Sequence, residues 1–361
     1  GIKVSIFCEY LRARSTHSTS TTMSRLCVNT FRTLRTLLSP SMDSGPAMSV
    51  LDLIGSTPVL QLNRMVSHRA LRGRVFLKLE YLNPGHSKKD RVALEIIREA
   101  RFDGSLALGQ TVVELTSGNT GTGLAIVCGA FGHPFIAVMS RGNSMERARM
   151  MEALGATVEL VDQAPDGTSG QVSGADLALV EIRVRQLVDK FDAFRADQFS
   201  LPGSVHAHEL YTGPELWAQC GGQVDAFVDF VGSAGSFTGV MRALRKVRSD
   251  VRGYVVEPAV AAVLSGAQAR STYHRIQGGG YAMTELPLLD RSLVDGYLAV
   301  DDDTVIRTTR LLARLEGVFG GFSTGANVAA ALNLLEESDE PISIAALACD
   351  SGLKYMSTDL Y

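Results

Sequence analysis

The chain has 361 residues, of which 45% are hydrophobic, 20% charged and 7% aromatic. At roughly 150 residues per domain, this length predicts two domains with a large buried core. No stretch reaches the roughly 18 to 20 uninterrupted apolar residues that a membrane span needs, so a transmembrane protein is excluded and no membrane partner is expected. The 35 glycines, about a tenth of the chain, are typical of a soluble α/β protein with many tight turns.

The net charge of −3 is unevenly distributed. Residues 1–42 carry a net charge of +5, whereas the remainder carries −8. Because the acidic remainder has no stripe of Lys and Arg, a nucleic-acid partner is excluded. The five cysteines are widely spaced and form no CxxC pair, so neither a disulfide framework nor a zinc site is indicated. A reducing compartment, by default the cytoplasm, is expected.

Residues 1–47 are rich in Ser, Thr and Arg and poor in acids, and we expect a disordered extension. Their composition resembles an organelle transit peptide, which would make the location organellar. The favoured alternative is upstream sequence read through before the true start, because Met48 directly precedes the first patterned segment.

From about residue 50, short apolar runs alternate with helical stretches, and Gly, Ser or Asn marks each junction. This alternation predicts an α/β fold with buried parallel strands. The predicted strands are 75–79, 111–116, 135–139, 157–161, 225–231, 252–256 and 342–348. The predicted helices are 90–102, 145–154, 175–190, 238–247, 303–315 and 325–337. A break rich in Pro and Gly near 191–222 predicts two α/β lobes, 48–200 and 201–361.

The strongest local motif is a strand at 225–231 that leads through small residues 232–239 into a helix. Free N–H groups at a helix start, Gly and Ser hydroxyls together form a site for an anion such as phosphate. The spacing matches neither the GxGxxG dinucleotide motif nor the P-loop. A plain tight turn is the alternative.

A second loop of the same kind, residues 116–121, also joins a strand to a helix. Two such loops indicate two anionic groups, one a cofactor phosphate and the other a substrate carboxylate. Asn119 is placed to donate to a ring oxygen or a carboxylate. Asn, Ser and Gly are also ordinary turn and cap residues, so the loop by itself leaves both interpretations open.

Lys88 and Lys89 follow a turn and begin a helix. The helix dipole disfavours a cation there, so a lysine is better explained if its amine is neutral, as in a Schiff base with an aldehyde cofactor. In isolation, two solvated lysines balanced by Asp90 are the simpler interpretation.

Residues 321–325 match GxSxG, the nucleophile elbow of α/β-hydrolases. Those enzymes need a histidine after the serine, yet all seven histidines precede Ser323, so chain order excludes this class. His206 and His208 have the spacing of a metal pair, but no cluster of carboxylates or cysteines accompanies them. We expect a hydrogen-bonded pair at a helix end, and no metal.

Together, these motifs resemble the cysteine synthase and cystathionine β-synthase family, the fold-type II enzymes that use pyridoxal 5′-phosphate. The resemblance runs from about residue 50 to the end of the chain. It rests on 54–60, Lys78, Glu80, 83–84, 87–91, 116–121, 145–147, 212–215, 232–239, 257–258, 276–278, 316–317, 321–326, Asp350, Gly352, Tyr355 and Ser357. It implies two doubly wound α/β lobes of the tryptophan synthase β type, with residues 48–85 crossing to the second lobe, and a homodimer.

The resemblance also implies a role for each matching residue. Lys89, the lysine of the S-x-K-D-R motif, and not Lys88, would form the internal aldimine with pyridoxal 5′-phosphate and act as the catalytic base. The other cofactor contacts implied are Asn119, Gly232, Ser233, Ala234, Gly235, Ser236 and Ser323. The substrate contacts implied are Thr116, Ser117, Gly118, Thr120, Gln198, Gly280 and Tyr281. A hydroxyl at Ser323, facing the pyridine nitrogen, favours elimination over transamination.

The implied reaction is β-replacement on an activated L-serine derivative through an α-aminoacrylate. The leading case is cysteine synthase, in which O-acetylserine and sulfide give L-cysteine and acetate. The alternative is a cystathionine β-synthase-like or other β-replacement enzyme that uses O-phosphoserine, serine or a different nucleophile such as homocysteine, thiosulfate or an amine. A serine or threonine dehydratase ranks lower, because residues 117–121 read SGNTG and a tetraglycine phosphate loop is absent. A catalytically idle binding protein of the same fold is the remaining alternative.

Several positions depart from the common cysteine synthase pattern. Arg141 and Asn143 add donors that suit a more anionic substrate or nucleophile, and Tyr281 is similar to the cystathionine β-synthases. Residues 164–174 form a longer segment than usual, either a lid or an exposed loop.

Two further departures lie beside the expected cofactor. Ala234 replaces a glycine in the phosphate loop, and Lys88 replaces an apolar residue next to Lys89. Each of these substitutions also has the simpler interpretation of tolerated drift.

Overall fold

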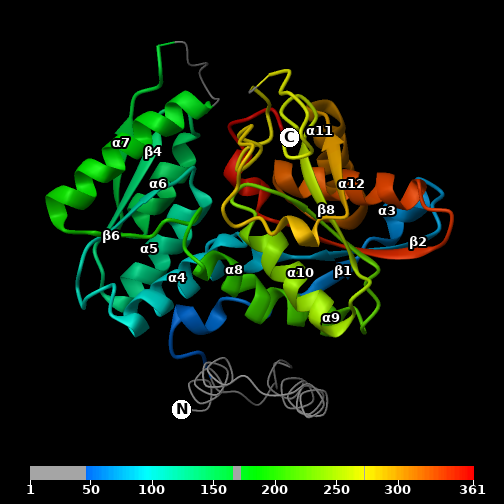
Figure 1. Ribbon diagram of the computed structural model, residues 1–361, viewed down its shortest axis with the longest axis horizontal. Coiled ribbons are helices and arrows are strands. Elements are labelled where there is room, and N and C mark those ends of the chain that lie inside the picture. The colour runs from blue at the N-terminus through cyan, green and yellow to red at the C-terminus, as the bar shows by residue number, and fades with distance from the viewer. Residues whose placement is uncertain (1–45, 166–171, 272) are drawn as a thin grey trace. The chain divides into compact units, whose positions relative to one another are not determined.

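The computed structural model describes residues 46–165, 172–271 and 273–361. The predicted extension 1–47 therefore lies almost entirely outside the described residues. Residues 46–361 form one compact unit in which strands and helices alternate along the chain (Figure 1). The predicted α/β class is confirmed, whereas the boundary between two lobes near residue 200 stays a prediction.

The larger of the two sheets has six strands in the order β1-β2-β10-β7-β8-β9. Only β1 is antiparallel to its neighbour, and the other described pairs are parallel. Its strands are β1 (Val59–Gln61), β2 (Gly73–Lys78), β7 (Ala226–Phe230), β8 (Arg252–Pro258), β9 (Gly296–Val300) and β10 (Ile342–Leu347). The second strand of the chain thus pairs with the last one, and β1 pairs with β2 at the edge of the sheet.

Alternating residues of these strands enter two different cores. Val75 and Leu77 of β2 pack in one cluster with helix α12, whereas Phe76 packs in another with helix α10. Strand β10 repeats the pattern, since Ile344 and Ala345 belong to opposite clusters. Because successive side chains of a strand point to opposite faces, a run that is apolar throughout requires helices on both faces.

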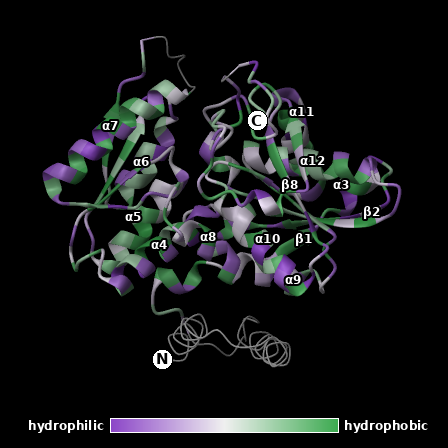
Figure 2. Ribbon diagram, in the orientation of Figure 1, coloured by the Kyte–Doolittle hydropathy of each residue, from purple (hydrophilic) through white to green (hydrophobic). Residues whose placement is uncertain are grey.

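The smaller sheet has four parallel strands in the order β5-β4-β3-β6. They are β3 (Val112–Leu115), β4 (Phe135–Ser140), β5 (Thr157–Val161) and β6 (Phe194–Arg195). Val112 and Val113 enter different core clusters, so this sheet is also covered on both faces. Figure 2 shows the strands of both sheets mostly in the hydrophobic colour.

The helices lie between the strands in sequence. They are α3 (Asn63–His68), α4 (Lys89–Asp103), α5 (Asn119–Phe131), α6 (Met145–Ala153), α7 (Gly174–Phe191), α8 (Gly203–Ala207), α9 (Gly213–Gln219), α10 (Gly235–Val247), α11 (Asp302–Glu316) and α12 (Phe322–Glu336). Short 3-10 segments are η1 (Val50–Leu53), η2 (Glu80–Leu82), η4 (Arg291–Leu293) and η5 (Gly352–Tyr355), and η3 (His208–Thr212) is a π-helical segment. None of the described helices is long and apolar enough to cross a membrane.

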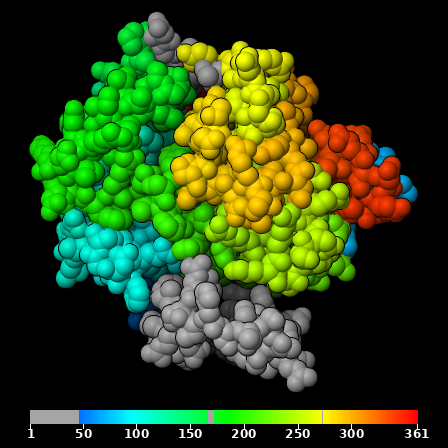
Figure 3. Space-filling view, viewed as in Figure 1, coloured from blue at the N-terminus to red at the C-terminus, as the bar shows by residue number. Residues whose placement is uncertain are grey.

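Every predicted strand and helix has a counterpart, and β5 has the predicted limits. The sequence did not predict β1, β6, β9, α3, α8 or α9, most of which are too short for a periodic pattern to emerge. In Figure 3, residues of the smaller sheet and its helices form the cyan and green side of the surface, and those of β8 to α12 the yellow and orange side. The helix starts that follow β3 and β7 carry the loops 116–121 and 232–236, and the candidate site is built from them.

Candidate functional site

The start of α4 is tied to the segment that follows β10. Ser87 pairs with Asp350 in an isolated bridge, and the N–H of Lys88 donates to the carbonyl of Cys349 at 2.8 Å. The hydroxyl of Ser87 accepts from the N–H of Lys89 at 3.2 Å. Lys88 is the residue before the helix and Lys89 is its first residue, and their side chains contact different partners.

A buried ionic network also holds the start of α4. The Arg91 guanidinium donates to both carboxylate oxygens of Glu80 and of Glu215 at 2.7–2.9 Å. Lys78 adds an ion pair to Glu215 at 2.8 Å, and Thr57 donates to Glu80 at 2.6 Å. Burial alone would raise the pKa of Glu80, but the charges of Arg91 and Lys78 and the hydrogen bonds from Arg91 and Thr57 together outweigh burial and lower that pKa to about 2. Motif residues from four separate segments thus share one anchor for α4.

The amine of Lys89 faces the smaller sheet. Its Nζ donates to Oε1 of Gln198 at 2.9 Å, and the Thr120 hydroxyl donates to the same oxygen at 2.6 Å. Gln198 is held in turn by its own N–H, which donates to Glu114 at 3.3 Å. Burial and then the nearby charge of Lys88 lower the pKa of Lys89 to about 8. A neutral, nucleophilic amine is therefore accessible near neutral pH.

The amine of Lys88 faces the larger sheet. Its Nζ lies 3.0 Å from Oδ1 of Asp229 on β7 and 2.8 Å from the Ser236 hydroxyl on α10. Burial alone would lower the pKa of Lys88, but its interactions with Asp229 and Cys349 together outweigh burial, and the pKa lies above its ordinary value. Lys88 therefore stays a cation, whereas Lys89 loses its proton more readily.

The loop between β7 and α10 packs closely against neighbouring backbone. Ala234, the residue before α10, has φ +64°, in the left-handed region that favours glycine. A Cβ on Gly232 would lie 2.6 Å from the carbonyl oxygen of Gly278, and one on Gly235 would lie 2.8 Å from that of Ser204. The first N–H groups of a helix have no acceptor within it, so this loop presents donors toward the site.

The loop before α5 fixes the amide of Asn119. Its Nδ2 donates to Asp350 at 2.8 Å, and its Oδ1 accepts from the ammonium of Lys354 at 2.8 Å. Gly118 has φ +127°, and a Cβ there would lie 2.4 Å from the Arg147 side chain. The Thr116 hydroxyl turns inward and accepts from the N–H groups of Gly118 and Gly121, both at 2.9 Å. This geometry leaves the Thr116 side chain in the turn itself.

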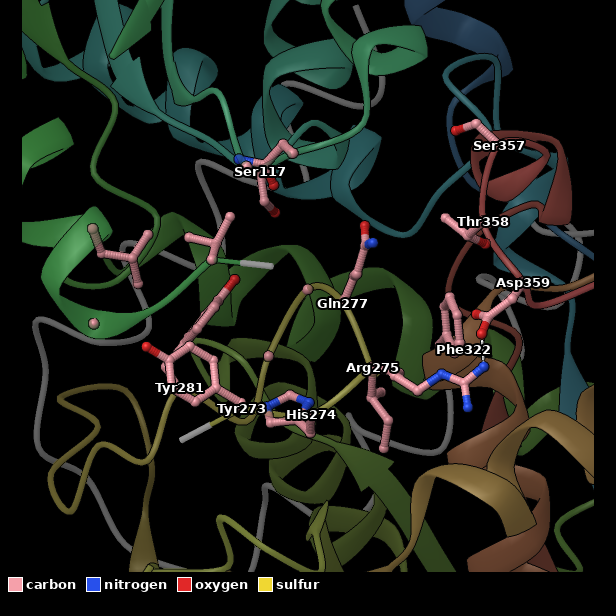
Figure 4. Close-up of a pocket in the computed structure, with 18 residues that line it drawn as sticks. Ser117, Tyr273, His274, Arg275, Gln277, Tyr281, Phe322, Ser357, Thr358 and Asp359 are labelled. Atoms are coloured by element: carbon pink, nitrogen blue, oxygen red, sulfur yellow. Dashed lines mark ion pairs between the residues drawn. The ribbon is translucent and has the colours of Figure 1, made fainter. Parts of the chain in front are cut away.

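A cavity of about 340 Å³ opens beside these loops. Figure 4 shows Gln277 extending from its loop toward Ser117, with Tyr281 along the same loop and Phe322 at another edge. The Tyr281 hydroxyl bonds the Ser117 side chain, and the Tyr281 ring packs edge-on against Phe199 at 6.4 Å. A second cavity of about 350 Å³ is lined by Arg310, Ala313, Arg314 and Tyr361, none of which is a predicted site residue.

The remaining polar motifs are accounted for by local contacts. Ser323, near the start of α12, bonds the Cys349 side chain, and both are buried. His206 bonds Glu99 at 2.5 Å, whereas His208 bonds the Thr212 hydroxyl at 2.9 Å. Each of the two histidines therefore has its own hydrogen-bond partner, as expected from the sequence.

The structure brings several predicted site residues together. Lys89, Thr120 and Gln198 are in contact, Lys88 reaches Ser236, and Ser117 and Tyr281 line the cavity. Gly280 has φ +68°, and a Cβ there would lie 2.4 Å from the Pro258 side chain.

The donor role expected of Arg141 is not supported. Its guanidinium is more than half exposed and pairs with the exposed Asp162 at 2.7 Å, because β4 ends there at the surface. Asn143 does line the cavity. The expectation for residues 164–174 falls largely outside the described residues.

Sequence reasoning gave no role to several residues that the structure places here: Asp229, Lys354, Glu114, His274 and Cys349. One of them had a visible signal, since Asp229 is a charged residue in the apolar strand DAFVDFV. Lys354 had none, because its contact with Asn119 joins positions 235 residues apart.

Comparison with known proteins identifies the family. Residues 50–350 match the model of the pyridoxal-phosphate dependent enzyme family. The chain is 39% identical to O-ureido-L-serine synthase from Streptomyces lavendulae over 315 residues, 87% of this chain and 92% of that protein. It is 35% identical to cysteine synthase from Staphylococcus aureus over 322 residues, 89% of this chain and 99% of the relative. The crystal structure of O-acetyl serine sulfhydrylase isoform 3 from Entamoeba histolytica superposes with a TM-score of 0.81 at 33% identity, covering 89% of this chain and 93% of that one.

The residues present fit pyridoxal 5′-phosphate. The site combines a lysine of lowered pKa with a helix start whose small residues leave no room for a Cβ at Gly232 or Gly235. It also holds a buried carboxylate oxygen without a partner among the described residues, Oδ1 of Asp350. The cofactor is pyridoxal 5′-phosphate, and the chemistry is β-replacement on serine derivatives. The chain therefore belongs to the pyridoxal-phosphate dependent enzymes and, within them, to the fold-type II family of the cysteine synthases and cystathionine β-synthases.

Proposed function

We propose that this chain is a cysteine synthase that converts O-acetylserine and sulfide to L-cysteine and acetate. The observation that carries the proposal is the convergence of Lys89, Thr120 and Gln198 next to the 116–121 loop. It places an amine of lowered pKa beside a helix start suited to an amino-acid carboxylate. The similarity to cysteine synthase from Staphylococcus aureus, over 89% of this chain and 99% of that protein, supports the same reaction.

Lys89 would act twice. Its neutral amine would bind the cofactor aldehyde, and after an amino acid displaced it, the same amine would take the proton from the α-carbon. The hydrogen bond to Gln198 at 2.9 Å would hold Nζ of Lys89 in position when the amine is not bound to the cofactor.

The loop 116–121 would bind the substrate carboxylate. Helix α5 begins within this loop, and the start of a helix favours an anion. Ser117 lies on the cavity wall and is bonded by Tyr281, so these two hydroxyls would orient the substrate from opposite loops. Thr116 would act mainly by fixing the turn, because its hydroxyl already accepts two backbone hydrogen bonds.

The cofactor phosphate would lie at residues 232–236, its ring oxygen near Asn119 and its pyridine nitrogen near Ser323. When bound, pyridoxal 5′-phosphate withdraws electrons from the α-carbon, which allows the α-proton and the β-substituent to depart. Lys354 and Asp350 orient the Asn119 amide through both of its polar atoms. Ser323 offers a hydroxyl where a carboxylate would keep a ring nitrogen protonated, and this favours β-replacement over transamination.

A larger polar nucleophile is the second candidate. The chain is 39% identical to O-ureido-L-serine synthase, whose product requires an oxygen nucleophile that bears a urea group. The wall of the cavity includes polar groups of Asn143, His274 and Gln277, which suit a polar nucleophile.

The test is a matrix of donors and nucleophiles with the full-length protein. O-acetylserine, O-phosphoserine and serine are each paired with sulfide, homocysteine, thiosulfate and hydroxyurea, and products are identified by mass spectrometry. The proposal expects the highest kcat/KM for O-acetylserine with sulfide. A higher value with hydroxyurea would replace the cysteine synthase assignment by the second candidate, and turnover of no pair would overturn both.

The homodimer and the cytoplasmic location stay predictions. Sedimentation velocity of the purified protein tests the first, and imaging of the tagged full-length chain tests the second against an organellar location.

A further inference from the structure

Strand β7 buries one charged residue in an otherwise apolar run. Asp229 is 0% exposed, between the neighbouring strands β10 and β8. A buried carboxylate is costly unless it is paired and hydrogen-bonded. Its partners are the ammonium of Lys88, at 3.0 and 3.2 Å, the hydroxyl of Ser236, and Nδ2 of Asn327 at 3.4 Å. The carboxylate is thus held at the base of the loop that leads into α10.

Lys88 lies between this carboxylate and the loop. Its side chain is 12% exposed, whereas Asp229 is fully enclosed, so the ammonium is the outer member of the pair. The same Nζ donates to the Ser236 hydroxyl at 2.8 Å, in the first turn of α10. Residues 232–241 contain no Lys or Arg. Lys88, which belongs to a different segment, therefore supplies a cation to this loop.

The electrostatics of this arrangement call for a second anion. The start of a helix has a partial positive charge and repels an ammonium placed beside it. Asp229 offsets that repulsion from the buried side only. An anion at the loop would pair with the ammonium and with the free N–H groups of α10 at the same time.

We propose that Lys88 is a phosphate-binding residue, whose ammonium, held by Asp229, pairs with the phosphate of pyridoxal 5′-phosphate at the Ser233–Ser236 loop. The proposal rests on the proposed function, because it needs the cofactor phosphate at that loop. Asp229 positions Lys88 and shares its charge. The two adjacent lysines then divide the cofactor between them, Lys88 at the phosphate and Lys89 at the aldehyde.

The experiment measures the affinity of the full-length apoprotein for pyridoxal 5′-phosphate and for pyridoxal, which lacks the phosphate. The variants are Lys88→Met, Lys88→Arg, Asp229→Asn and the double variant Lys88→Met/Asp229→Asn. We expect Lys88→Met to weaken binding of pyridoxal 5′-phosphate by roughly tenfold or more, because it leaves the Asp229 carboxylate unpaired near the phosphate. Its affinity for pyridoxal should change far less, and Lys88→Arg should restore much of the loss.

Asp229→Asn should strengthen phosphate binding, because the ammonium is then no longer shared. The double variant should lie between the two single variants. A second measurement uses inorganic phosphate as the probe. Phosphate should raise the unfolding temperature of the wild-type apoprotein, and Lys88→Met should reduce that shift.

Two results would overturn the proposal. One is equal loss of affinity for pyridoxal and pyridoxal 5′-phosphate in Lys88→Met, and the other is loss rather than gain in a folded Asp229→Asn variant. Either would leave Lys88 and Asp229 as a structural ion pair. Unfolding temperatures measured without ligand show whether each variant folds, and the sign for Asp229→Asn decides the matter if Lys88→Met does not fold. A wild-type apoprotein that binds no pyridoxal 5′-phosphate would instead overturn the proposed function.

Discussion

Lys88 and Lys89 are neighbours in sequence, yet their side chains enter two different regions. Lys88 enters the region of β7 and α10, where Asp229 raises its pKa above the ordinary value. Lys89 enters the region of Gln198 and Thr120, where it meets neutral partners and its pKa falls to about 8. Burial acts in the same direction on both amines. The difference shows that the charges beside each buried amine separate a fixed cation, paired with Asp229, from an amine that loses its proton more readily.

Both environments depend on the same anchor. The network of Arg91, Glu80 and Glu215 holds the start of α4, from which both amines extend. Substitutions at either lysine or at the anchor should therefore change the difference between the two environments.

Lys89→Ala should give the largest effect. It removes both the cofactor amine and the base, so turnover should fall by on the order of 10⁴. Steady-state formation of product measures this. Lys190→Ala, at an exposed lysine of α7, is the matched control and should leave turnover unchanged. Activity in Lys89→Ala close to that of the control would remove Lys89 from the mechanism.

Arg91→Met should break the anchor. It leaves the buried carboxylates of Glu80 and Glu215 with less compensation, and loss of one partner of a buried ion pair costs about 3–5 kcal/mol. Urea unfolding of the apoprotein measures the change. The control is Arg141→Met, whose ion pair is exposed and should contribute little. Equal effects of the two substitutions would show that the network does not anchor α4.

The pH dependence of cofactor binding tests whether the charges of the two lysines are coupled. Only the neutral amine reacts, so the rate at which apoprotein binds pyridoxal 5′-phosphate through Lys89 should rise with pH and level off above about 8. Lys88→Met should move the midpoint upward, since the charge of Lys88 lowers the pKa of Lys89, and Asp229→Asn should move it downward. Stopped-flow absorbance measures the rates. A midpoint that neither substitution moves would show that the two lysines are not coupled.

Ala234→Gly should have the smallest effect. Ala234 has φ +64°, where glycine is unstrained, so the substitution should stabilise the protein by about 0.5–1 kcal/mol. Ala243→Gly, in the interior of the same helix, is the matched control and should destabilise by about 1 kcal/mol. Thermal unfolding of both variants measures the contrast. Two changes of the same sign would contradict strain at Ala234.

The sequence predicted the parts of this molecule that local pattern determines. Seven of the ten described strands and the two loops at helix starts follow from apolar runs that end in small residues. The roles that the resemblance implies for Lys89, Asn119 and Ser323 stay predictions. The sequence did not predict β9, an edge strand whose residues are mostly only half-buried. Nor did it predict the partner of Lys88, because Lys88 and Asp229 are 141 positions apart and meet only through the tertiary fold. The helix dipole acts alike at the start of α4, whereas the side-chain environments beyond that start differ between the two lysines.

The most direct test of the account is to identify which lysine holds the cofactor. The full-length protein with bound pyridoxal 5′-phosphate is reduced with borohydride, digested, and analysed by tandem mass spectrometry with fragmentation between residues 88 and 89. The account predicts that the pyridoxyl group is on Lys89 and that Lys88 is unmodified. A pyridoxyl group on Lys88 would contradict the division of roles between the two amines.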